Sequence, residues 1–183
     1  MIDLENYARE RLSSGRFAHV CGVVKAAGSL AQKHGADEKR VQTAAWLHDI
    51  YRELPEQRLR ELAQEVGAVI PDGDPVTWHG PVCAARMSFE FAIDDEEIAE
   101  AVRWHTVGHP DMGLLSQILF VADAIEPTRR YHGIEELRLV AQENLPMAVA
   151  KVADSSISYL IAREKPIALS TVQLRNAIWA GLK

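Results

Sequence analysis

The sequence predicts an all-α fold, a helical bundle in which residues 1–183 form one domain. Apolar residues recur at helical spacing in one segment after another, as on the buried face of an amphipathic helix. Gly, Pro and Asp residues lie between these segments, where they are expected to cap or end helices. No convincing strand pattern interrupts them. A chain of this length supports a single sizeable core, and we expect the C-terminal helices to pack on it.

The first clear helix is expected over residues 16–34, where the apolar side chains line one face. These side chains are Val20, Val23, Val24, Ala27, Leu30 and Ala31. Gly35 then suits the left-handed conformation that often ends a helix. Asp37 is a good N-cap for the next helix, which we expect to run to about Ile50.

The later helices are delimited by the same kinds of signal, with Pro at a start and Gly- and Pro-rich loops between them. Their expected ranges are 55–66, 77–91, 94–105, 114–125, 134–144, 146–163 and 169–181. Pro81 is compatible with its helix only because it falls in the first turn. The stretches 67–76 and 106–113 are expected to be loops.

Composition excludes several classes of protein. A net charge of −6 argues against a broad nucleic-acid or membrane surface, although a small basic pocket remains compatible with it. No apolar run approaches the roughly 20 residues that span a bilayer, and the acidic N-terminal stretch does not resemble a signal peptide. Cys21 and Cys83 show no metal-binding spacing and are expected to be reduced core thiols in a cytoplasmic protein.

Six polar residues stand out because they fall at helix ends or beside apolar stripes. They are His19, His48, Asp49, His79, His105 and Asp123. A carboxylate buried without a partner costs several kcal/mol, so a compensating cation is required. An Arg or Lys side chain is one solution. A divalent ion is the other, since imidazole and carboxylate together suit iron, manganese and zinc.

The motifs around these residues are more specific than the residues alone. "RFAHVCGVV", "AAWLHDIYREL", "HGPVCAARM", "AVRWHTVGHPDM" and "ILFVADAIEPTRRYHGIEELR" together resemble the HD-domain metal-dependent phosphohydrolases. Within that superfamily they are most similar to the symmetrical bis(5'-nucleosyl)-tetraphosphatases of bacteria, the YqeK family. The resemblance runs from about residue 14 to the C-terminus.

The resemblance implies an HD-domain helical bundle that hydrolyses diadenosine tetraphosphate to two ADP molecules. It implies a divalent metal, with iron expected and manganese or zinc as alternatives. His19, His48, Asp49 and Asp123 would hold the principal ion. His79 and His105 would hold a second ion, or contact phosphate if only one ion binds. Asp49, His79 and His105 would then be the catalytic residues.

Further residues are expected to contact the dinucleoside polyphosphate substrate or the ADP product. The arginines are the strongest of these candidates, since a guanidinium binds phosphate in a bidentate fork. The full set is Arg16, Asp49, Ile50, Tyr51, Arg52, His79, His105, Thr106, Asp123 and Arg129. The sequence leaves open the number of ions, the nucleobase preference and whether the protein forms a homodimer.

Three rival activities are weighed against this one. The first is an HD phosphohydrolase acting on another nucleotide, as a nucleotidase or a phosphodiesterase. The second is a di-iron oxygenase of the HD type, which would require dioxygen. The third is a binding or scaffold role with an inert metal site, which is disfavoured because no expected ligand is missing from the sequence.

Overall fold

The computed structural model describes residues 2–70 and 74–181, and this part of the chain contains ten α-helices, one short 3₁₀ helix and no strand. The helices are α1 (Leu4–Arg11), α2 (Ser14–His34), α3 (Glu38–Leu47), α4 (Glu56–Glu65), α5 (His79–Phe91), α6 (Glu96–Trp104), α7 (Leu114–Ile125), α8 (Ile134–Glu143), α9 (Leu145–Ala162) and α10 (Leu169–Gly181). The 3₁₀ helix η1 spans Pro75–Thr77. The all-α prediction is confirmed.

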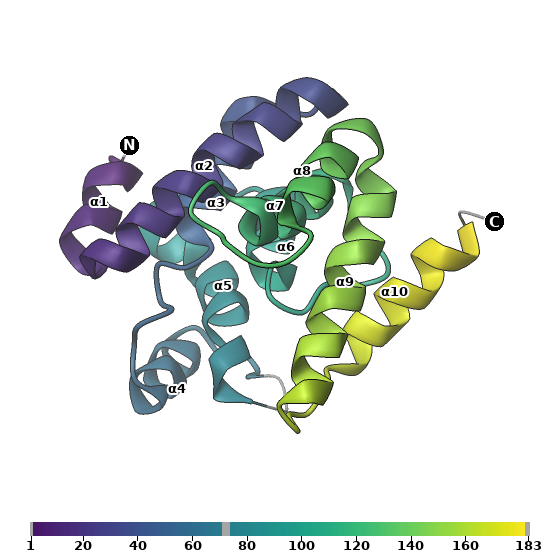
Figure 1. Cartoon of the computed structure of the whole chain (residues 1–183). Helices are drawn as coiled ribbons and strands as arrows, with labels where there is room; N and C mark the ends of the chain where they lie inside the picture. Colours follow the sequence, from purple (N-terminus) through teal and green to yellow (C-terminus); the bar gives the residue numbers. More distant parts are fainter. Residues whose placement is uncertain (1, 71–73, 182–183) are drawn as a thin grey trace.

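Helix α7 supplies much of the core because it is apolar almost all round, which is expected of a helix surrounded by others. Its buried side chains include Ile118, Leu119 and Val121. In Figure 1 α6 and α7 lie near the centre, α2 and α9 flank them, and α10 packs along α9 at the outer edge. Buried side chains from all ten described helices join one hydrophobic cluster.

The end of α3 differs from the boundary predicted from the sequence. The helix expected to reach Ile50 ends at Leu47, so Asp49 lies in a turn rather than on a helix face. The carbonyl of Ala45, which would accept from the Asp49 amide in a continuing helix, instead contacts the His48 Nδ1 atom at 2.7 Å. The turn continues with i→i−3 hydrogen bonds up to Leu54. Pro55 follows, and a proline disfavours the helical conformation of the residue before it.

Helix α1 was not delimited from the sequence, and the helix expected from residue 77 begins at His79 after η1. The predicted loop 67–76 contains residues 71–73, which lie outside the described residues. Over the described part of the chain, no helix combines the length and the apolar character that crossing a bilayer demands.

Candidate metal centre

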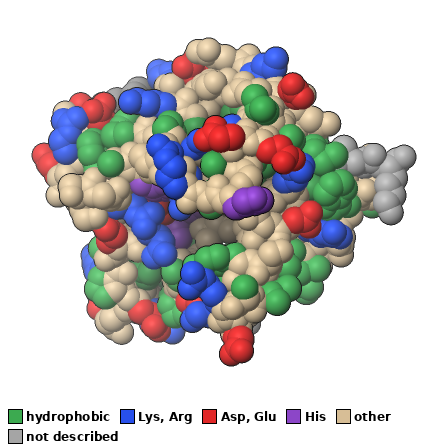
Figure 2. Space-filling view, in the orientation of Figure 1, with side chains coloured by type: hydrophobic (Ala, Val, Ile, Leu, Met, Phe, Trp, Pro, Cys, Tyr) green, Lys and Arg blue, Asp and Glu red, His purple; other side chains and the backbone are tan. Residues whose placement is uncertain are grey.

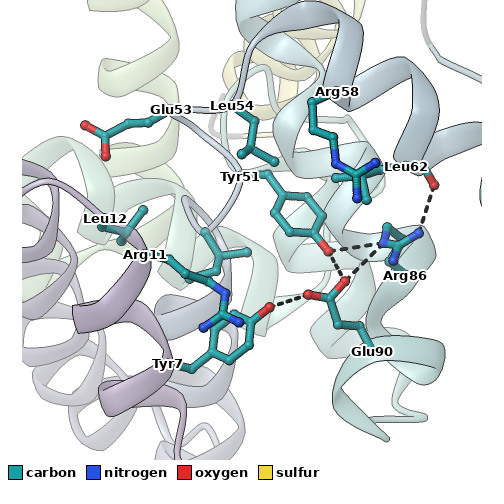
Figure 3. A pocket seen from close by; sticks show the side chains of 11 residues that line it. Tyr7, Arg11, Leu12, Tyr51, Glu53, Leu54, Arg58, Leu62, Arg86 and Glu90 are labelled. Atoms are coloured by element: carbon teal, nitrogen blue, oxygen red, sulfur yellow. Dashed lines mark hydrogen bonds and ion pairs between the residues drawn. The ribbon is translucent and has the colours of Figure 1, made fainter.

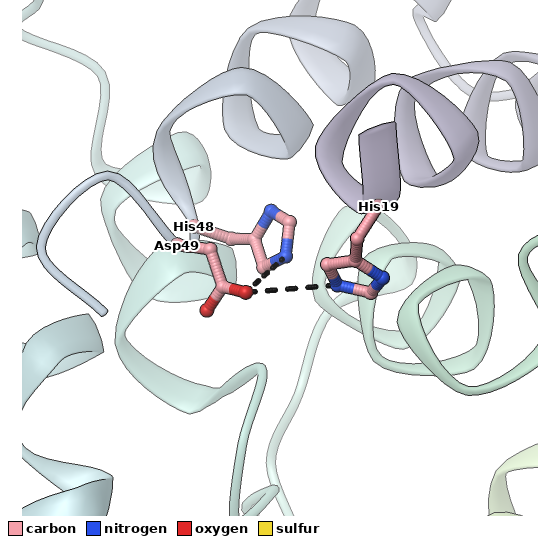
Figure 4. Close-up of side chains that lie close together, drawn as sticks. All are labelled: His19, His48 and Asp49. Atoms are coloured by element: carbon pink, nitrogen blue, oxygen red, sulfur yellow. Dashed lines mark ion pairs between the residues drawn. The ribbon is translucent and has the colours of Figure 1, made fainter. Parts of the chain in front are cut away.

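Four buried histidines and Asp49 meet where α2, α3, α5 and α6 converge. The relative exposures are 8% for His19, 0% for His48, 4% for Asp49 and 3% for both His79 and His105. Figure 4 shows the His19 and His48 rings converging on the Asp49 carboxylate. Figure 2 shows that this face of the molecule is hollowed near its middle, with histidine side chains at the edge and Lys and Arg side chains around it.

Three of the histidines are oriented by contacts with backbone carbonyl oxygens at the ends of helical segments. The Nδ1 atoms of His48, His79 and His105 lie 2.7, 2.9 and 2.8 Å from the backbone carbonyl oxygens of Ala45, Val76 and Val102. A carbonyl only accepts, so each Nδ1 must carry the proton. In the neutral ring this leaves the Nε2 lone pair directed toward the centre, as a metal ligand requires.

Asp49 lies between two groups of imidazoles. Its Oδ2 atom is 3.6 Å from His19 Nε2 and 3.5 Å from His48 Nε2, while its Oδ1 atom is 3.1 Å from His79 Nε2 and 3.7 Å from His105 Nε2. The ligand atoms of His19, His48 and Asp49 lie within 4.8 Å of one another, and so do those of Asp49, His79 and His105. The Asp49 carboxylate therefore belongs to both triads and could contribute one oxygen to each.

The contact between His79 and His105 indicates a cation at the second triad. Their Nε2 atoms are 2.9 Å apart, although both Nδ1 atoms are already protonated. Two lone pairs at this separation repel unless a proton or a metal ion lies between them. The Thr106 hydroxyl is 3.0 Å from His105 Nε2 and 3.4 Å from His79 Nε2, so it borders the same spot.

The protonation equilibria of the centre follow from burial and crowding. Burial lowers the pKa of His48 to about 4, and burial also lowers the pKa of His79. Burial would raise the pKa of Asp49, but the surrounding histidines, His48 first, hold that pKa well below its usual value. The nearby carboxylates, by contrast, raise the pKa of His19 and the pKa of His105 against the effect of burial. The centre therefore places an ionised Asp49 carboxylate beside the neutral imidazoles of His48 and His79, and neutral imidazole and carboxylate are the forms that bind divalent metals.

The fit of a metal to this site is supported by two unsatisfied nitrogens. The Nε2 atoms of His19 and His48 are buried and form no hydrogen bond with any described residue. Such orphaned polar atoms are uncommon in proteins and call for an explanation. Imidazole nitrogens and carboxylate oxygens are suitable donors for iron, manganese and zinc, so a divalent ion would satisfy them.

Asp123, predicted as the distant metal ligand, reaches the centre from α7. Its Oδ1 atom is 3.1 Å from His19 Nε2, outside hydrogen-bond geometry, and accepts a hydrogen bond of 2.9 Å from Arg129. The sequence left two possible cations for Asp123, an arginine or a metal ion. The position of Asp123 is compatible with both, because the Arg129 guanidinium lies beside it and the buried imidazoles lie next to it. The contact with His19, followed by the effects of His48 and His105, holds the pKa of Asp123 far below its usual value, against the effect of burial.

The predicted phosphate-binding arginines differ in their engagement. Arg16 donates to Asp49 Oδ2 at 2.7 Å and is partly exposed. Arg129 is paired with Asp123. The side chain of Arg52 makes no hydrogen bond or ion pair with any residue that the structure describes, and its charge contributes to the lowered pKa of His79, after burial and His105. Arg52 is therefore the arginine with the most freedom to bind an anion near the second triad.

Ile50 and Tyr51 are not brought to the centre. Both are 4% exposed and lie behind the turn that carries Asp49. The Tyr51 hydroxyl donates to Glu90 and accepts from Arg86, as Figure 3 shows. These residues line a separate cavity of about 450 Å³ between α1, α4 and α5. This geometry does not support the expectation that Ile50 and Tyr51 touch the substrate.

Sequence reasoning missed Glu126, a carboxylate that is only 1% exposed and lies 3.2 Å from His19 Nδ1 through its Oε1 atom. It directly follows the predicted α7 stripe, inside the "ADAIEPTRR" motif. The available signal was an acidic residue placed at the end of an otherwise apolar helix and directly before Pro127.

Several known proteins are similar to this chain over most of its length. The HD domain matches residues 16–128, a span that contains all six predicted metal-binding residues. A Bacillus subtilis protein described as bis(5'-nucleosyl)-tetraphosphatase, symmetrical, is 32% identical over 94% of this chain and 94% of its own length. A Halalkalibacterium halodurans protein of the same description is 32% identical over 93% of this chain and 92% of its own.

A solved structure shares the whole fold. It is described as a predicted HD superfamily hydrolase involved in NAD metabolism, from Clostridium acetobutylicum. It superposes with a TM-score of 0.92 at 29% identity, over 97% of this chain and 96% of that one.

Proposed function

Because the chain belongs to the HD-domain family, and within it to the symmetrical bis(5'-nucleosyl)-tetraphosphatases of the YqeK type, we propose that it hydrolyses diadenosine tetraphosphate and related dinucleoside polyphosphates to two nucleoside diphosphates. The observation that carries the proposal is the position of Asp49. Its two carboxylate oxygens each face a pair of buried imidazoles with protonated Nδ1 atoms. Such an arrangement is suited to divalent ions and to phosphate chemistry.

We assign the metal ligands from these contacts. His19, His48, Asp49 and Asp123 would hold one ion, and Asp49, His79 and His105 a second one, with iron as the expected metal. The chemistry that a bound divalent ion supplies is polarisation of a phosphoryl oxygen and a lower pKa for a water molecule. The protein's contribution is a rigid set of ligands whose outer nitrogens are already held by the backbone or by Glu126.

Arginines would hold the polyphosphate across the mouth of this centre. The Arg52 guanidinium is unpaired among the described residues, and it would bind the bridge near the second triad. Arg16 and Arg129 contact the carboxylates of Asp49 and Asp123, so they would bring positive charge to the phosphates that approach those residues. Thr106, beside His79 and His105, offers a hydroxyl for a further phosphate oxygen. Catalysis of phosphoryl transfer rests mainly on such positioning and charge neutralisation.

The products define the bond that breaks. Two identical nucleoside diphosphates arise only if water attacks one of the two inner phosphorus atoms. A new P–O bond then forms to the water oxygen, the central bridging P–O bond breaks, and its electron pair leaves with the second nucleoside diphosphate. The proton released by the water needs an acceptor, and His79 and His105 are the nearest candidates if either is not bound to metal.

The test is analysis of the products by chromatography. The chelator-treated protein is incubated with diadenosine tetraphosphate, with and without added Fe²⁺, Mn²⁺ or Zn²⁺. The proposal expects ADP as the sole nucleotide product and a requirement for metal. AMP together with ATP would contradict symmetrical cleavage, and turnover only in the presence of dioxygen would favour an oxygenase.

We also propose that the protein works in the cytoplasm. Cys21 and Cys83 are both free thiols, and Cys83 is fully buried, which suits a reducing compartment. Cell fractionation that recovers the protein with periplasmic or membrane markers would contradict this location.

A further inference from the structure

Glu126 is a buried carboxylate with three hydrogen-bonding partners. Its Oε1 atom lies 3.2 Å from His19 Nδ1 and accepts from the Thr128 hydroxyl, while its Oε2 atom accepts from the Thr128 amide at 2.7 Å. Both oxygens accept hydrogen bonds from Thr128, Oε1 from its hydroxyl and Oε2 from its amide, so the carboxylate acts as an acceptor and His19 Nδ1 carries the proton.

This arrangement distinguishes His19 from the other three histidines of the centre. His48, His79 and His105 lie against backbone carbonyls of their own segments. His19 lies in the middle of α2, where the carbonyls are engaged in the helix ladder, so it needs a partner from elsewhere in the chain. Glu126, 107 residues away in the sequence, provides it.

The chain makes room for this carboxylate at Gly22, one turn after His19 on α2. A Cβ atom at Gly22 would lie 2.4 Å from Glu126 Oε2 and 3.2 Å from its Cδ atom. Any other residue at this position would force the carboxylate aside. Gly22 is in ordinary helix, and no positive φ angle requires glycine there.

We propose that Glu126 is a positioning residue for the metal centre and acts through His19. Its carboxylate fixes the ring orientation and the Nδ1–H tautomer of His19, so that Nε2 is presented to the ion, and increases the basicity of that nitrogen. The same carboxylate closes the 126–129 turn through Thr128, and Arg129 in that turn contacts Asp123. Glu126 thus links His19 of the first triad with Asp123, the further residue proposed to hold the first ion.

The inference rests on the proposed metal site and not on the identity of the substrate, so its test measures metal binding directly. Mn²⁺ binding to the metal-free protein is followed by calorimetry and by the metal-induced rise in the melting temperature. Glu126→Gln should weaken Mn²⁺ binding about 10- to 100-fold. The amide can accept from only one side, so either His19 or the Thr128 amide loses its partner.

A double-mutant cycle separates a positioning role from a merely structural one. In a His19→Asn background, adding Glu126→Gln should change Mn²⁺ affinity by less than about twofold, because the route through His19 is already removed. The matched control is Glu100→Gln, a carboxylate that accepts from Gly113 and Ser116 on another part of the molecule. The control should bind Mn²⁺ like the wild type.

Gly22→Ala provides a second variant should Glu126→Gln fail to fold, because it displaces the same carboxylate without removing it. Gly15→Ala is its control on the same helix, where an added Cβ meets nothing within 4 Å. Wild-type affinity in a folded Glu126→Gln or Gly22→Ala protein would overturn the inference, as would equal losses from Glu126→Gln with and without His19. Failure of the wild type itself to bind Mn²⁺ would instead overturn the proposed metal centre, and this inference with it.

Discussion

Gly80 offers a sharp test of the contact between α5 and α6 behind the second triad. A Cβ atom at this position would lie 2.6 Å from the Val102 carbonyl oxygen and 3.0 and 3.1 Å from the Cε1 and Nδ1 atoms of His105. The nearest of these atoms is backbone, so the helices themselves must separate. Overpacking of this kind costs about 1–3 kcal/mol of folding free energy. Replacing a helical glycine by alanine recovers about 0.5–1 kcal/mol.

Gly80→Ala should therefore lower the unfolding free energy by about 1 kcal/mol, the difference between the midpoints of these two ranges, measured by urea denaturation of the metal-free protein. The larger effect is expected on activity. The added methyl group presses on the ring of His105 and on the carbonyl that orients it, and displacement of a reacting group by about 1 Å costs on the order of a hundredfold in rate.

The control is Gly15→Ala, which should be neutral or slightly stabilising because its methyl group meets open space. A Gly80→Ala protein with unchanged stability would refute the close packing of α5 on α6. A destabilised variant with unchanged kcat and metal affinity would refute the placement of His105 in the centre.

Three further predictions follow from single contacts. Asp49→Ala should abolish ADP release while the far-ultraviolet circular dichroism stays helical, because the residue faces both triads; retained turnover would count against the assignment. Arg129→Ala should raise KM for the tetraphosphate about tenfold, the effect of losing one charged hydrogen bond, and leave Mn²⁺ bound; an unchanged KM would remove Arg129 from substrate binding. Asp95 caps α6, and its hydrogen bond with Arg40 holds the pKa of Asp95 below the usual 3.8. The Asp95 carboxylate therefore stabilises the fold above about pH 4, and this stabilisation is lost as the pH falls through the folded-state pKa. Asp95→Asn keeps a capping oxygen, so its melting temperature should fall below that of the wild type at pH 7 and approach it near pH 3; a constant difference would exclude the carboxylate charge as the cause.

The helices could be predicted from the sequence wherever one side of a segment is apolar and its ends carry a cap or a breaker. The expected range 114–125 coincides with α7 because its stripe is long and is bounded by Gly113 and by the Glu126–Pro127 pair. The end of α3 was placed about three residues late. The apolar pattern continues through Ile50, so it predicts a longer helix. The pattern of apolar residues does not reveal that the His48 ring contacts the Ala45 carbonyl.

In the candidate site, too, some residues could be predicted from the sequence and others could not. The histidines and Asp49 were identifiable because buried polar groups at helix ends call for a cation. Glu126 was missed although it is an acidic residue at the end of an apolar helix. Its partner His19 lies on another helix, and no local sequence pattern predicts that contact. Ile50 and Tyr51 stand beside the ligands in the sequence, but the turn after His48 directs their side chains into the core.

The central claim is that buried imidazoles around Asp49 bind divalent metal. Crystals grown with Mn²⁺ and measured at the manganese absorption edge test it most directly. The account predicts an anomalous peak bonded to His19, His48 and Asp49, with a second peak at His79 and His105 if two ions bind. Crystals of protein whose hydrolysis requires Mn²⁺, yet with no peak at Asp49 and a peak elsewhere, would contradict it.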